Sequence, residues 1–166
     1  MPALSPGYIL PAATSVQCYP GATTLAKRGP RRQYAALPST VGADGRRLVL
    51  LVTSRETRRW VLPKGWAESG VSPHDQAARE AFEEAGVKGE VGQERIGSYR
   101  YLKRLGGGRT VPCRVDVYPL TVDHLLDEWP EKEQRELGWF TPSEAAAVVE
   151  ESGLIELLLD LAARDA

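Results

Sequence analysis

The sequence predicts an α/β fold in which helices lie on both sides of a mixed β-sheet, an α/β/α sandwich. Strand-like apolar segments occur before and after a helix-like segment at 73–85, and a second helix-like segment occupies 154–163. The segment 47–53 (RLVLLVT) is almost continuously apolar, as expected of a strand that is covered on both faces. A chain of 166 residues with 42% hydrophobic residues suffices for one domain with a core.

Composition and charge narrow the classes of partner. The net charge is −1 without a basic stripe, so we do not expect long nucleic acid as a ligand. No apolar run approaches the length of a membrane span, and the first residues lack the charged and apolar regions of a secretory signal. Two cysteines, Cys18 and Cys113, are interpreted as free thiols in a reducing compartment. We therefore expect a cytoplasmic protein that acts on a small molecule, as a monomer or homodimer.

The first part of the chain differs in composition from the rest. Residues 1–30 are rich in Pro, Ala, Gly, Ser and Thr and show neither helical nor strand periodicity. Residues 1–43 carry a charge of +4 and contain no acid, whereas the remainder carries −5. We predict a flexible extension over 1–30 and one folded domain over 31–166.

Two strands and a turn open the predicted domain. Segments 33–41 and 47–53 have strand character and flank a turn at 42–45 (GADG). A short strand at 60–62 (WVL) then leads into a glycine-containing loop that begins at Pro63.

The segment 73–85 has the start and stop signals of a helix. Ser72 is a good N-cap, Pro73 suits the first helical position, and Asp75 stands at the capping-box position. Gly86 is a natural stop. Helical periodicity places three carboxylates, those of Glu80, Glu83 and Glu84, on one face, opposite Ala78, Ala81, Phe82 and Ala85.

The second half of the domain is predicted to contain a hairpin, one more strand and two helices. Segments 94–105 and 110–122 can pair through the turn 106–108 (GGG), and 125–136 is predicted to be a polar loop or broken helix. Segment 137–140 (LGWF) has strand character. The sequence Thr-Pro-Ser-Glu at 141–144 then opens a helix, and 154–163 forms an amphipathic helix.

The three stacked carboxylates have two interpretations. Like charges one turn apart destabilise a helix, so a favourable interaction should offset them. One interpretation is a solvated acidic face, with Arg79 paired to Glu83 four residues later. The other is a site for a hard cation, because Mg²⁺ prefers oxygen ligands and a carboxylate cluster beside a phosphate-sized opening suits it.

The spacing of the surrounding residues decides between them. Gly65, Arg79-Glu80, Glu83-Glu84 and Gly86-Val87 reproduce the Nudix box, Gly-x5-Glu-x7-Arg-Glu-U-x-Glu-Glu-x-Gly-U, where U is a bulky aliphatic residue. The chain therefore resembles the Nudix hydrolases, which cleave substituted nucleoside and other diphosphates, over roughly 31–163. Two positions depart from the pattern: Val71 replaces the first Glu of the box, and Ala81 replaces a larger aliphatic residue.

The resemblance implies roles for the residues of the box. Glu80, Glu84 and a main-chain carbonyl near Lys64 or Gly65 would bind Mg²⁺ or Mn²⁺. Glu83 would bind a further metal or act as general base, and Arg79 would hold Glu83 in place. In the family the first Glu steadies the loop against the helix, so Val71 puts catalytic efficiency in question without removing a metal ligand.

The box begins with Pro63-Lys64-Gly65, with Arg55 before it and the segment Gly-Val-Lys-Gly at 86–89 after it. Together these features resemble the branch that hydrolyses diphosphoinositol polyphosphates and dinucleoside polyphosphates. This similarity places seven residues at phosphate-contacting positions: Arg32, Thr53, Ser54, Arg55, Lys64, Lys103 and Arg135. Many cationic donors suit a substrate with many phosphates, although each basic side chain taken singly also fits a solvated strand end. Trp66 is a candidate for stacking on an adenine ring.

We thus expect a metal-dependent hydrolase of polyphosphorylated small molecules. One alternative is a pyrophosphatase acting on ADP-ribose, another nucleoside-diphosphate derivative or a capped RNA end. The other alternative is a non-catalytic Nudix module that senses a nucleotide, which the substitution at Val71 would favour and the intact carboxylates disfavour.

Overall fold

A computed structural model describes residues 29–165. Its single mixed sheet contains eight strands. They are β1 (Arg31–Val41), β2 (Arg47–Thr53), β3 (Trp60–Val61), β4 (Lys64–Trp66), β5 (Val87–Val91), β6 (Gly97–Arg104), β7 (Thr110–Leu125) and β8 (Leu137–Phe140). The N-terminal extension predicted over 1–30 lies almost wholly outside the described residues, and so does Cys18; Cys113 is a buried free thiol.

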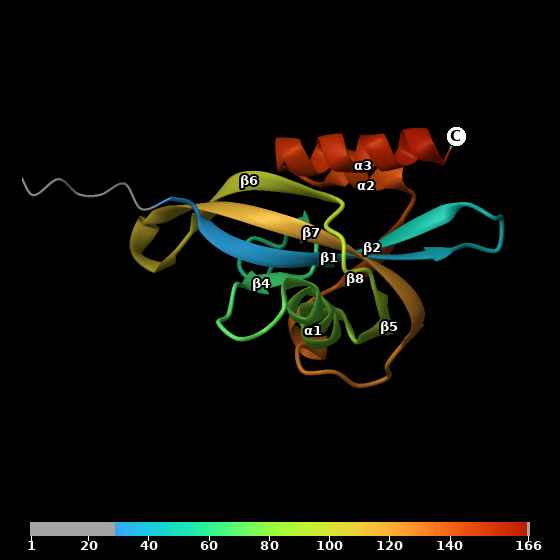
Figure 1. Cartoon of the computed structure of the whole chain (residues 1–166), viewed down its shortest axis with the longest axis horizontal. Helices are drawn as coiled ribbons and strands as arrows, with labels where there is room; N and C mark the ends of the chain where they lie inside the picture. Colours follow the sequence, from blue (N-terminus) through green and yellow to red (C-terminus); the bar gives the residue numbers. More distant parts are fainter. Residues whose placement is uncertain (1–28, 166) are drawn as a thin grey trace, which may run out of the picture.

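Helices cover both faces of the sheet (Figure 1). Helix α1 (Pro73–Ala85) lies on one side, and α2 (Pro142–Val148) and α3 (Ser152–Arg164) lie together on the other. Two short 3₁₀ turns, at Gly106–Gly108 and Lys132–Gln134, complete the described structure. The predicted α/β/α sandwich is confirmed. Within residues 29–165, no helix has the length and apolarity needed to cross a bilayer.

Strand β1 is the centre of the sheet, and its neighbours explain where a pocket can form. It pairs in parallel with β7 along one edge. Along its other edge it pairs first with β4, at Gln33 to Ala35, and then with β2, at Ser39 to Val41. Strands β4 and β2 therefore share one edge of β1 without pairing with each other, and the chain between them forms the loop 54–59 and then β3, which pairs with β2.

Two apolar clusters hold the layers together, one on each face. Strand β2 contributes to both, since Val49 and Leu51 pack beneath α2 and α3 whereas Leu50 and Val52 pack against α1. This alternation explains why its sequence is apolar throughout, as predicted. Leu154 and Leu158 of α3 are fully buried in the first cluster.

The predicted ends of α1 are confirmed. The Ser72 hydroxyl accepts a hydrogen bond from the Asp75 amide at 3.3 Å. Gly86 adopts a left-handed conformation, with φ of 65°, and its amide donates to the carbonyl of Phe82. A Cβ atom added at Gly86 would also stand only 2.7 Å from the nearest ring atoms of Trp129. Glycine thus serves both the turn and the close approach of the loop that carries Trp129.

Three features differ from the sequence-based expectation. Strands β4 and β5 were not predicted, because KGW and VKGEV are short, polar and glycine-containing and are strands only through their partners. Strand β7 extends three residues further than predicted, since its end pairs with β5. The buried residues of α1 are Gln76, Ala77, Ala81, Glu84 and Ala85, whereas Ala78 and Phe82 are only partly buried. Glu84 is only 6% exposed, so it does not lie on a solvated face.

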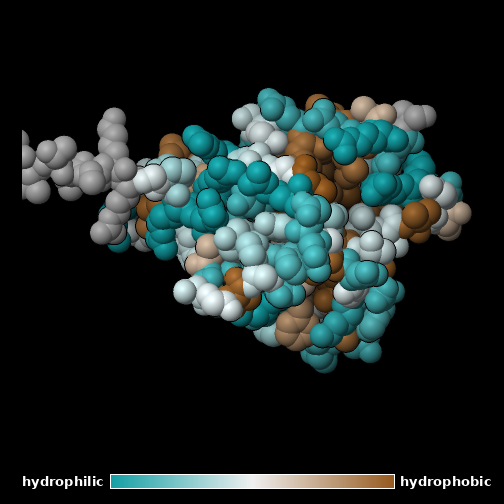
Figure 2. Space-filling view, in the orientation of Figure 1, coloured by the Kyte–Doolittle hydropathy of each residue, from teal (hydrophilic) through white to brown (hydrophobic). Residues whose placement is uncertain are grey.

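The surface is mostly polar. In the space-filling view, hydrophilic residues cover most of the face shown, and hydrophobic residues are visible in limited patches (Figure 2). The exposed large hydrophobic side chains come from separate elements; Val41 and Leu102 are the most exposed, at 70% and 65%. Such scattered exposure is ordinary for a globular domain.

Candidate active site

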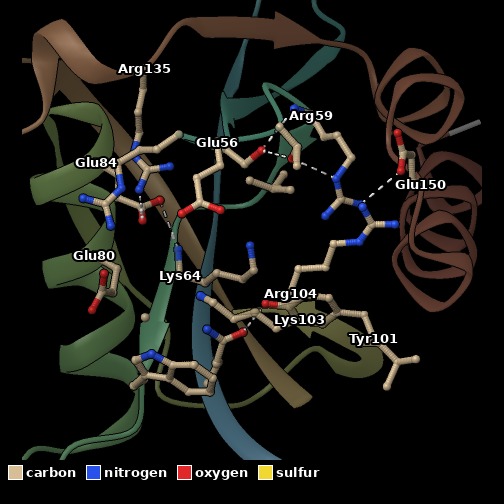
Figure 3. A pocket seen from close by; sticks show the side chains of 18 of the residues that line it. Glu56, Arg59, Lys64, Glu80, Glu84, Tyr101, Lys103, Arg104, Arg135 and Glu150 are labelled. Atoms are coloured by element: carbon tan, nitrogen blue, oxygen red, sulfur yellow. Dashed lines mark hydrogen bonds and ion pairs between the residues drawn. The ribbon is translucent and has the colours of Figure 1, made fainter. Parts of the chain in front are cut away.

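A pocket of about 840 Å³ opens beside β4 and the loop 54–59 that follows β2. Most of its lining comes from this loop, β4, α1, β6 and the segment before β8, and Gln33, Val61, Thr110 and Glu150 complete it. Figure 3 shows the carboxylates of Glu80 and Glu84 on α1, with the Arg135 side chain beside Glu84, and Lys64 and Lys103 across from α1. The volume is within the range of small-molecule sites.

The acidic side of the pocket is formed by Glu80 and Glu84, which lie about one turn apart on α1. Glu80 packs directly on β4, and a Cβ atom on Gly65 would stand 1.9 Å from Glu80 Oε1. Burial raises the pKa of Glu80, and the nearby charge of Glu83 raises it further. The glycine at this box position therefore leaves the space that the Glu80 carboxylate occupies.

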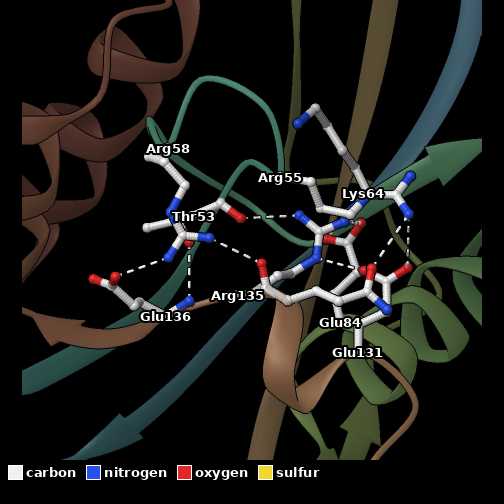
Figure 4. Close-up of polar contacts among 9 residues, drawn as sticks. Thr53, Arg55, Arg58, Lys64, Glu84, Glu131, Arg135 and Glu136 are labelled. Atoms are coloured by element: carbon white, nitrogen blue, oxygen red, sulfur yellow. Dashed lines mark hydrogen bonds and ion pairs between the residues drawn. The ribbon is translucent and has the colours of Figure 1, made fainter.

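Glu84 is held in a buried network of polar contacts (Figure 4). Its Oε1 accepts from Arg135 Nη2 at 2.7 Å, and its Oε2 lies 3.4 Å from the amide nitrogen of Lys64. Arg135 also donates to Glu131 Oε2 at 2.5 Å and to the Thr53 carbonyl at 3.0 Å. Burial nevertheless raises the pKa of Glu84 to about 7, with the Arg135 charge acting in the opposite direction.

Arg79 and Glu83 are partly exposed residues of α1 that are not among those lining the pocket. Arg79 Nε is 3.9 Å from Glu83 Oε1, as the four-residue spacing predicts, but Arg79 Nη2 makes a shorter contact, 2.7 Å, with Glu68 Oε1. The buried amide of Gln76 ties the same loop to α1, since it donates to the Trp66 carbonyl and accepts from the Glu68 amide at 2.9 Å. The contacts of Glu68 and Gln76 thus connect the box loop to α1 in this protein, where Val71 replaces the first Glu of the box.

The opposite side of the pocket is cationic. Lys64 of β4 and Lys103 of β6 both line it, and Lys64 Nζ lies 5.6 Å from the centre of the Tyr101 ring. Burial lowers the pKa of Lys64 to about 8, against the raising effect of Glu84. Arg55 and Arg59 line a third side from the loop 54–59 and are paired with acids: Arg55 with Glu131 at 3.8 Å, and Arg59 with two glutamates of the α2–α3 junction at 3.1 Å.

Of the seven residues predicted to contact phosphate, the pocket lining includes Ser54, Arg55, Lys64, Lys103 and Arg135. Thr53 lies behind it, where its hydroxyl accepts from the Glu136 amide at 2.9 Å. Arg32 lies elsewhere: its Nε is 3.7 Å from the buried Asp116, which also binds Arg95 and Arg114. The pocket also contains Glu131, Gln33 and Tyr101, which the sequence did not indicate. They reach the pocket through strand pairing and through the loop before β8, and neither leaves a signal in the local sequence.

The acidic side of the pocket offers oxygen donors of the kind that a divalent cation binds. Carboxylates and main-chain carbonyls are the oxygen donors that Mg²⁺ prefers. Within residues 29–165, however, no three acidic, histidine or cysteine side chains are grouped closely enough to hold a metal. Arg135 accounts for part of this, because its guanidinium lies between Glu84 and Glu131 and supplies positive charge there.

The contact between Gly65 and Glu80 gives a first prediction. Gly65→Ala is expected to displace the Glu80 carboxylate and to lower kcat/KM by at least about 100-fold, since the added Cβ overlaps it. The fold should persist, because Gly65 does not need a left-handed backbone. The matched control is Gly106→Ala, which adds a Cβ where no atom lies within 4 Å. Equal activity in both variants would contradict the placement of Glu80.

Comparisons with known proteins identify the family. The family model for the NUDIX domain matches residues 30–160. Nudix hydrolase 12, mitochondrial, of Arabidopsis thaliana is 35% identical over 105 residues, which cover 58% of this chain and 49% of the relative. Human diphosphoinositol polyphosphate phosphohydrolase 3-alpha is 34% identical over 105 residues, covering 62% of this chain and 60% of the relative. The matched part therefore spans about half to three fifths of these relatives.

Solved structures share the fold at lower sequence identity. The C. elegans Ap4A hydrolase superposes with a TM-score of 0.60 at 17% identity, over 82% of this chain and 99% of that one. The solution structure of the E. coli ORF135 protein gives a TM-score of 0.56 at 24% identity, over 82% and 91% of the two chains. The box residues, the layered sheet and the family match lead to one conclusion: this chain belongs to the NUDIX domain family.

Proposed function

We propose that the protein is a metal-dependent hydrolase that cleaves phosphoanhydride bonds in polyphosphorylated small molecules. The observation that carries this proposal is that one pocket is lined both by the α1 carboxylates Glu80 and Glu84 and by the amino groups of Lys64 and Lys103. A phosphoanhydride needs both: donors for a metal at the bond that breaks, and positive charge for the remaining phosphates.

Glu80 and Glu84 are the proposed carboxylate ligands of Mg²⁺ or Mn²⁺. The strand register favours the carbonyl of Lys64 over that of Gly65 as the main-chain donor. Ala36 and Ala67 donate across the β1–β4 ladder to Pro63 and Arg32, so the alternation of an antiparallel pair turns Gly65 toward β1. It turns Lys64 away, toward α1, where its amide lies beside Glu84.

The proposed reaction is attack by water on phosphorus. The water oxygen forms a bond to phosphorus, the anhydride P–O bond breaks, and the leaving phosphate keeps the bonding pair. A bound divalent cation supplies neutralisation of the phosphate oxygens and activation of water. Glu83 is the proposed general base, since its half-exposed carboxylate is only loosely paired with Arg79 and can accept the water proton.

The proposed substrates are dinucleoside polyphosphates or diphosphoinositol polyphosphates. The cationic side of the pocket supports a substrate with several phosphates, and the similarity to human diphosphoinositol polyphosphate phosphohydrolase 3-alpha supports the same class. A second candidate is a nucleotide-sensing module without catalysis. The ion pair of Arg135 with Glu84 favours this second candidate, because Arg135 already neutralises the carboxylate that would otherwise bind a metal.

The contact of Glu68 with Arg79 gives a second prediction, on the loss of the first box Glu. Glu68→Ala is expected to lower kcat about 10-fold, since Arg79 then loses its shortest contact. Adding Val71→Glu to this variant should restore much of the rate, because it supplies a carboxylate at the usual box position. If Glu68→Ala is as active as wild type, so that there is no loss for Val71→Glu to restore, Glu68 does not position Arg79.

A substrate panel tests the proposed function. Release of phosphate and nucleotide is measured with diadenosine tetra- and pentaphosphate, a diphosphoinositol polyphosphate, ADP-ribose and a nucleoside triphosphate, each with Mg²⁺ and with Mn²⁺. The proposal predicts fast, metal-dependent cleavage of the polyphosphates. Cleavage of ADP-ribose alone would contradict the substrate class, and binding without turnover on any compound would favour the sensing module.

A further inference from the structure

Three arginines stand side by side on three neighbouring strands, β6, β7 and β1 (Figure 1). In the register of the sheet, Arg100 pairs with Arg114, and Arg114 pairs with Arg32. Residues that are directly opposed on neighbouring strands project to the same face of a sheet. Three guanidinium groups therefore form one row on one face, and all three residues lie outside the pocket lining.

A fourth arginine joins this row through a buried acid, Asp116, which is 4% exposed. Arg95 Nη1 and Arg114 Nε lie 3.0 and 3.1 Å from Asp116 Oδ1. Arg32 Nε lies 3.7 Å from Asp116 Oδ2. Among residues 29–165, no other carboxylate forms an ion pair with any of these arginines. Arg32, Arg95, Arg100 and Arg114, here called the arginine face, thus carry three positive charges in excess.

The strand order does not account for this charge. Arg100 and Arg114 are directly opposed in an antiparallel pair, where like charges are destabilising. An edge strand often carries charged residues that prevent aggregation, and in the described part of the chain β6 has only β7 as a partner. This explanation covers Arg100, but Arg114 and Arg32 belong to interior strands. An anionic partner would offset the repulsion along the whole row.

The arginine face is open to solvent. On β6, Arg100 and Leu102 are exposed, whereas Tyr99 on the opposite face is buried in the cluster beneath α2 and α3. Helix α1 covers the same face of the sheet only from Tyr34 and Tyr118 onward, and each of these is 8% exposed. Their rings therefore offer no platform on which nucleic-acid bases could stack.

Large apolar side chains border the arginine face. Leu102, which is 65% exposed, follows Arg100 on the same face of β6 and also borders the pocket. Ile96, which directly follows Arg95, is 41% exposed. Protein–protein interfaces are enriched in arginine and depleted of lysine, and they combine apolar contacts with polar ones. The composition of this surface therefore favours a protein partner over a nucleic acid.

From these observations we infer that the arginine face is a docking surface for an acidic segment of a partner protein, in which carboxylates are interspersed with apolar side chains. Guanidinium groups bind carboxylates through two parallel hydrogen bonds. The carboxylates of the segment bind the arginines, and its apolar side chains contact Leu102 and Ile96. The inference does not depend on the proposed hydrolase activity, because the four arginines lie outside the pocket lining.

Binding of synthetic peptides to the full chain tests this surface. Fluorescence anisotropy gives the Kd of a labelled peptide of glutamates interrupted by leucines. The same measurement is made with a peptide that has serine at the leucine positions, and with an oligodeoxythymidylate. The variants are Arg100→Glu and Arg114→Gln. Arg164→Gln, at the exposed last residue of α3, is the matched control.

We expect the Kd for the leucine-containing peptide to rise about 10-fold in Arg114→Gln, since a hydrogen bond between charged groups is lost. It should rise further in Arg100→Glu, which places a negative charge on the surface, and stay at the wild-type value in Arg164→Gln. Arg100→Glu should nevertheless melt at a higher temperature than wild type, because it replaces a like-charge pair with an opposite-charge pair. Its weaker binding would then not follow from misfolding.

The outcomes separate this inference from its alternatives. If folded Arg100→Glu and Arg114→Gln bind the acidic peptide as wild type does, the docking surface is refuted. If only the oligodeoxythymidylate binds, and both variants weaken its binding, the ligand is a nucleic acid and the inferred partner is wrong. Equal binding of the leucine and serine peptides would contradict the apolar contacts. Hydrolysis of the polyphosphate substrates should be unchanged in Arg100→Glu.

Discussion

Glu84→Gln is expected to lower kcat/KM by about 10³-fold or more, which corresponds to about 4 kcal/mol of lost transition-state stabilisation. Glutamine has nearly the same shape and keeps one oxygen acceptor, which can face Arg135, while its NH2 group replaces the oxygen near the Lys64 amide; the negative charge needed to hold a divalent cation is lost. The measurement is a steady-state assay with the polyphosphate substrates. Glu156→Gln, on an exposed position of α3, serves as the control.

The same substitution should stabilise the metal-free fold at pH 8. A carboxyl group whose pKa rises on folding, here from 4.5 to about 7, binds more protons in the folded state between these values. Its contribution to stability is therefore present below pH 4.5 and is lost as the pH rises to about 7. Urea unfolding in EDTA should show this decline in wild type, and Glu84→Gln should lack it and gain roughly 1–3 kcal/mol at pH 8.

Full activity of Glu84→Gln would contradict the assignment of Glu84 as a metal ligand. A loss of activity together with a loss of stability would also count against the assignment, because misfolding would then explain the lower rate. The pH series thus separates a role in catalysis from a role in the fold.

Arg135→Met is expected to destabilise the metal-free protein by about 3 kcal/mol at pH 8. Its side chain is 7% exposed, and its guanidinium bonds to Glu84, Glu131 and the Thr53 carbonyl, so its removal leaves two partly buried carboxylates without this cation. The loss should shrink at pH 5.5, where Glu84 is protonated. Chemical unfolding at both pH values measures it.

A double variant and added metal identify the cause of that loss. Glu84→Gln in the Arg135→Met background should recover much of the stability, because one unpaired charge is removed. Saturating Mg²⁺ should also recover stability, since a divalent cation then meets the carboxylates. If Arg135→Met is as stable as wild type at pH 8, Arg135 does not neutralise this site.

The sequence was sufficient to predict the elements that local signals define. Ser72 and Gly86 mark the ends of α1, the apolar run 47–53 marks a strand between two cores, and Gly65 with Glu80 and Glu84 marks the carboxylate side. Each of these depends on residues at most 19 positions apart along the chain, the separation of Gly65 and Glu84. Spacing along one helix or one loop is enough to place them.

The rest of the site depends on contacts between distant segments. The pairing of Arg135 with Glu84 spans 51 residues, and that of Gln33 with Tyr101 spans 68. Arg32 was predicted to contact phosphate, and the structure places it beside Asp116, because register sends successive residues of β1 to opposite faces. Its role in substrate binding remains a prediction, and it would require movement of a side chain that now pairs with a buried acid.

Titration of the metal-free protein with Mn²⁺, followed by electron paramagnetic resonance, tests the central claim most directly. The claim is that Glu80 and Glu84 form a divalent metal site in one pocket with a cationic side. The account predicts bound Mn²⁺ in wild type, much weaker binding in Glu80→Gln and in Glu84→Gln, and no change in Glu156→Gln. Equal Mn²⁺ binding in all four proteins would contradict it.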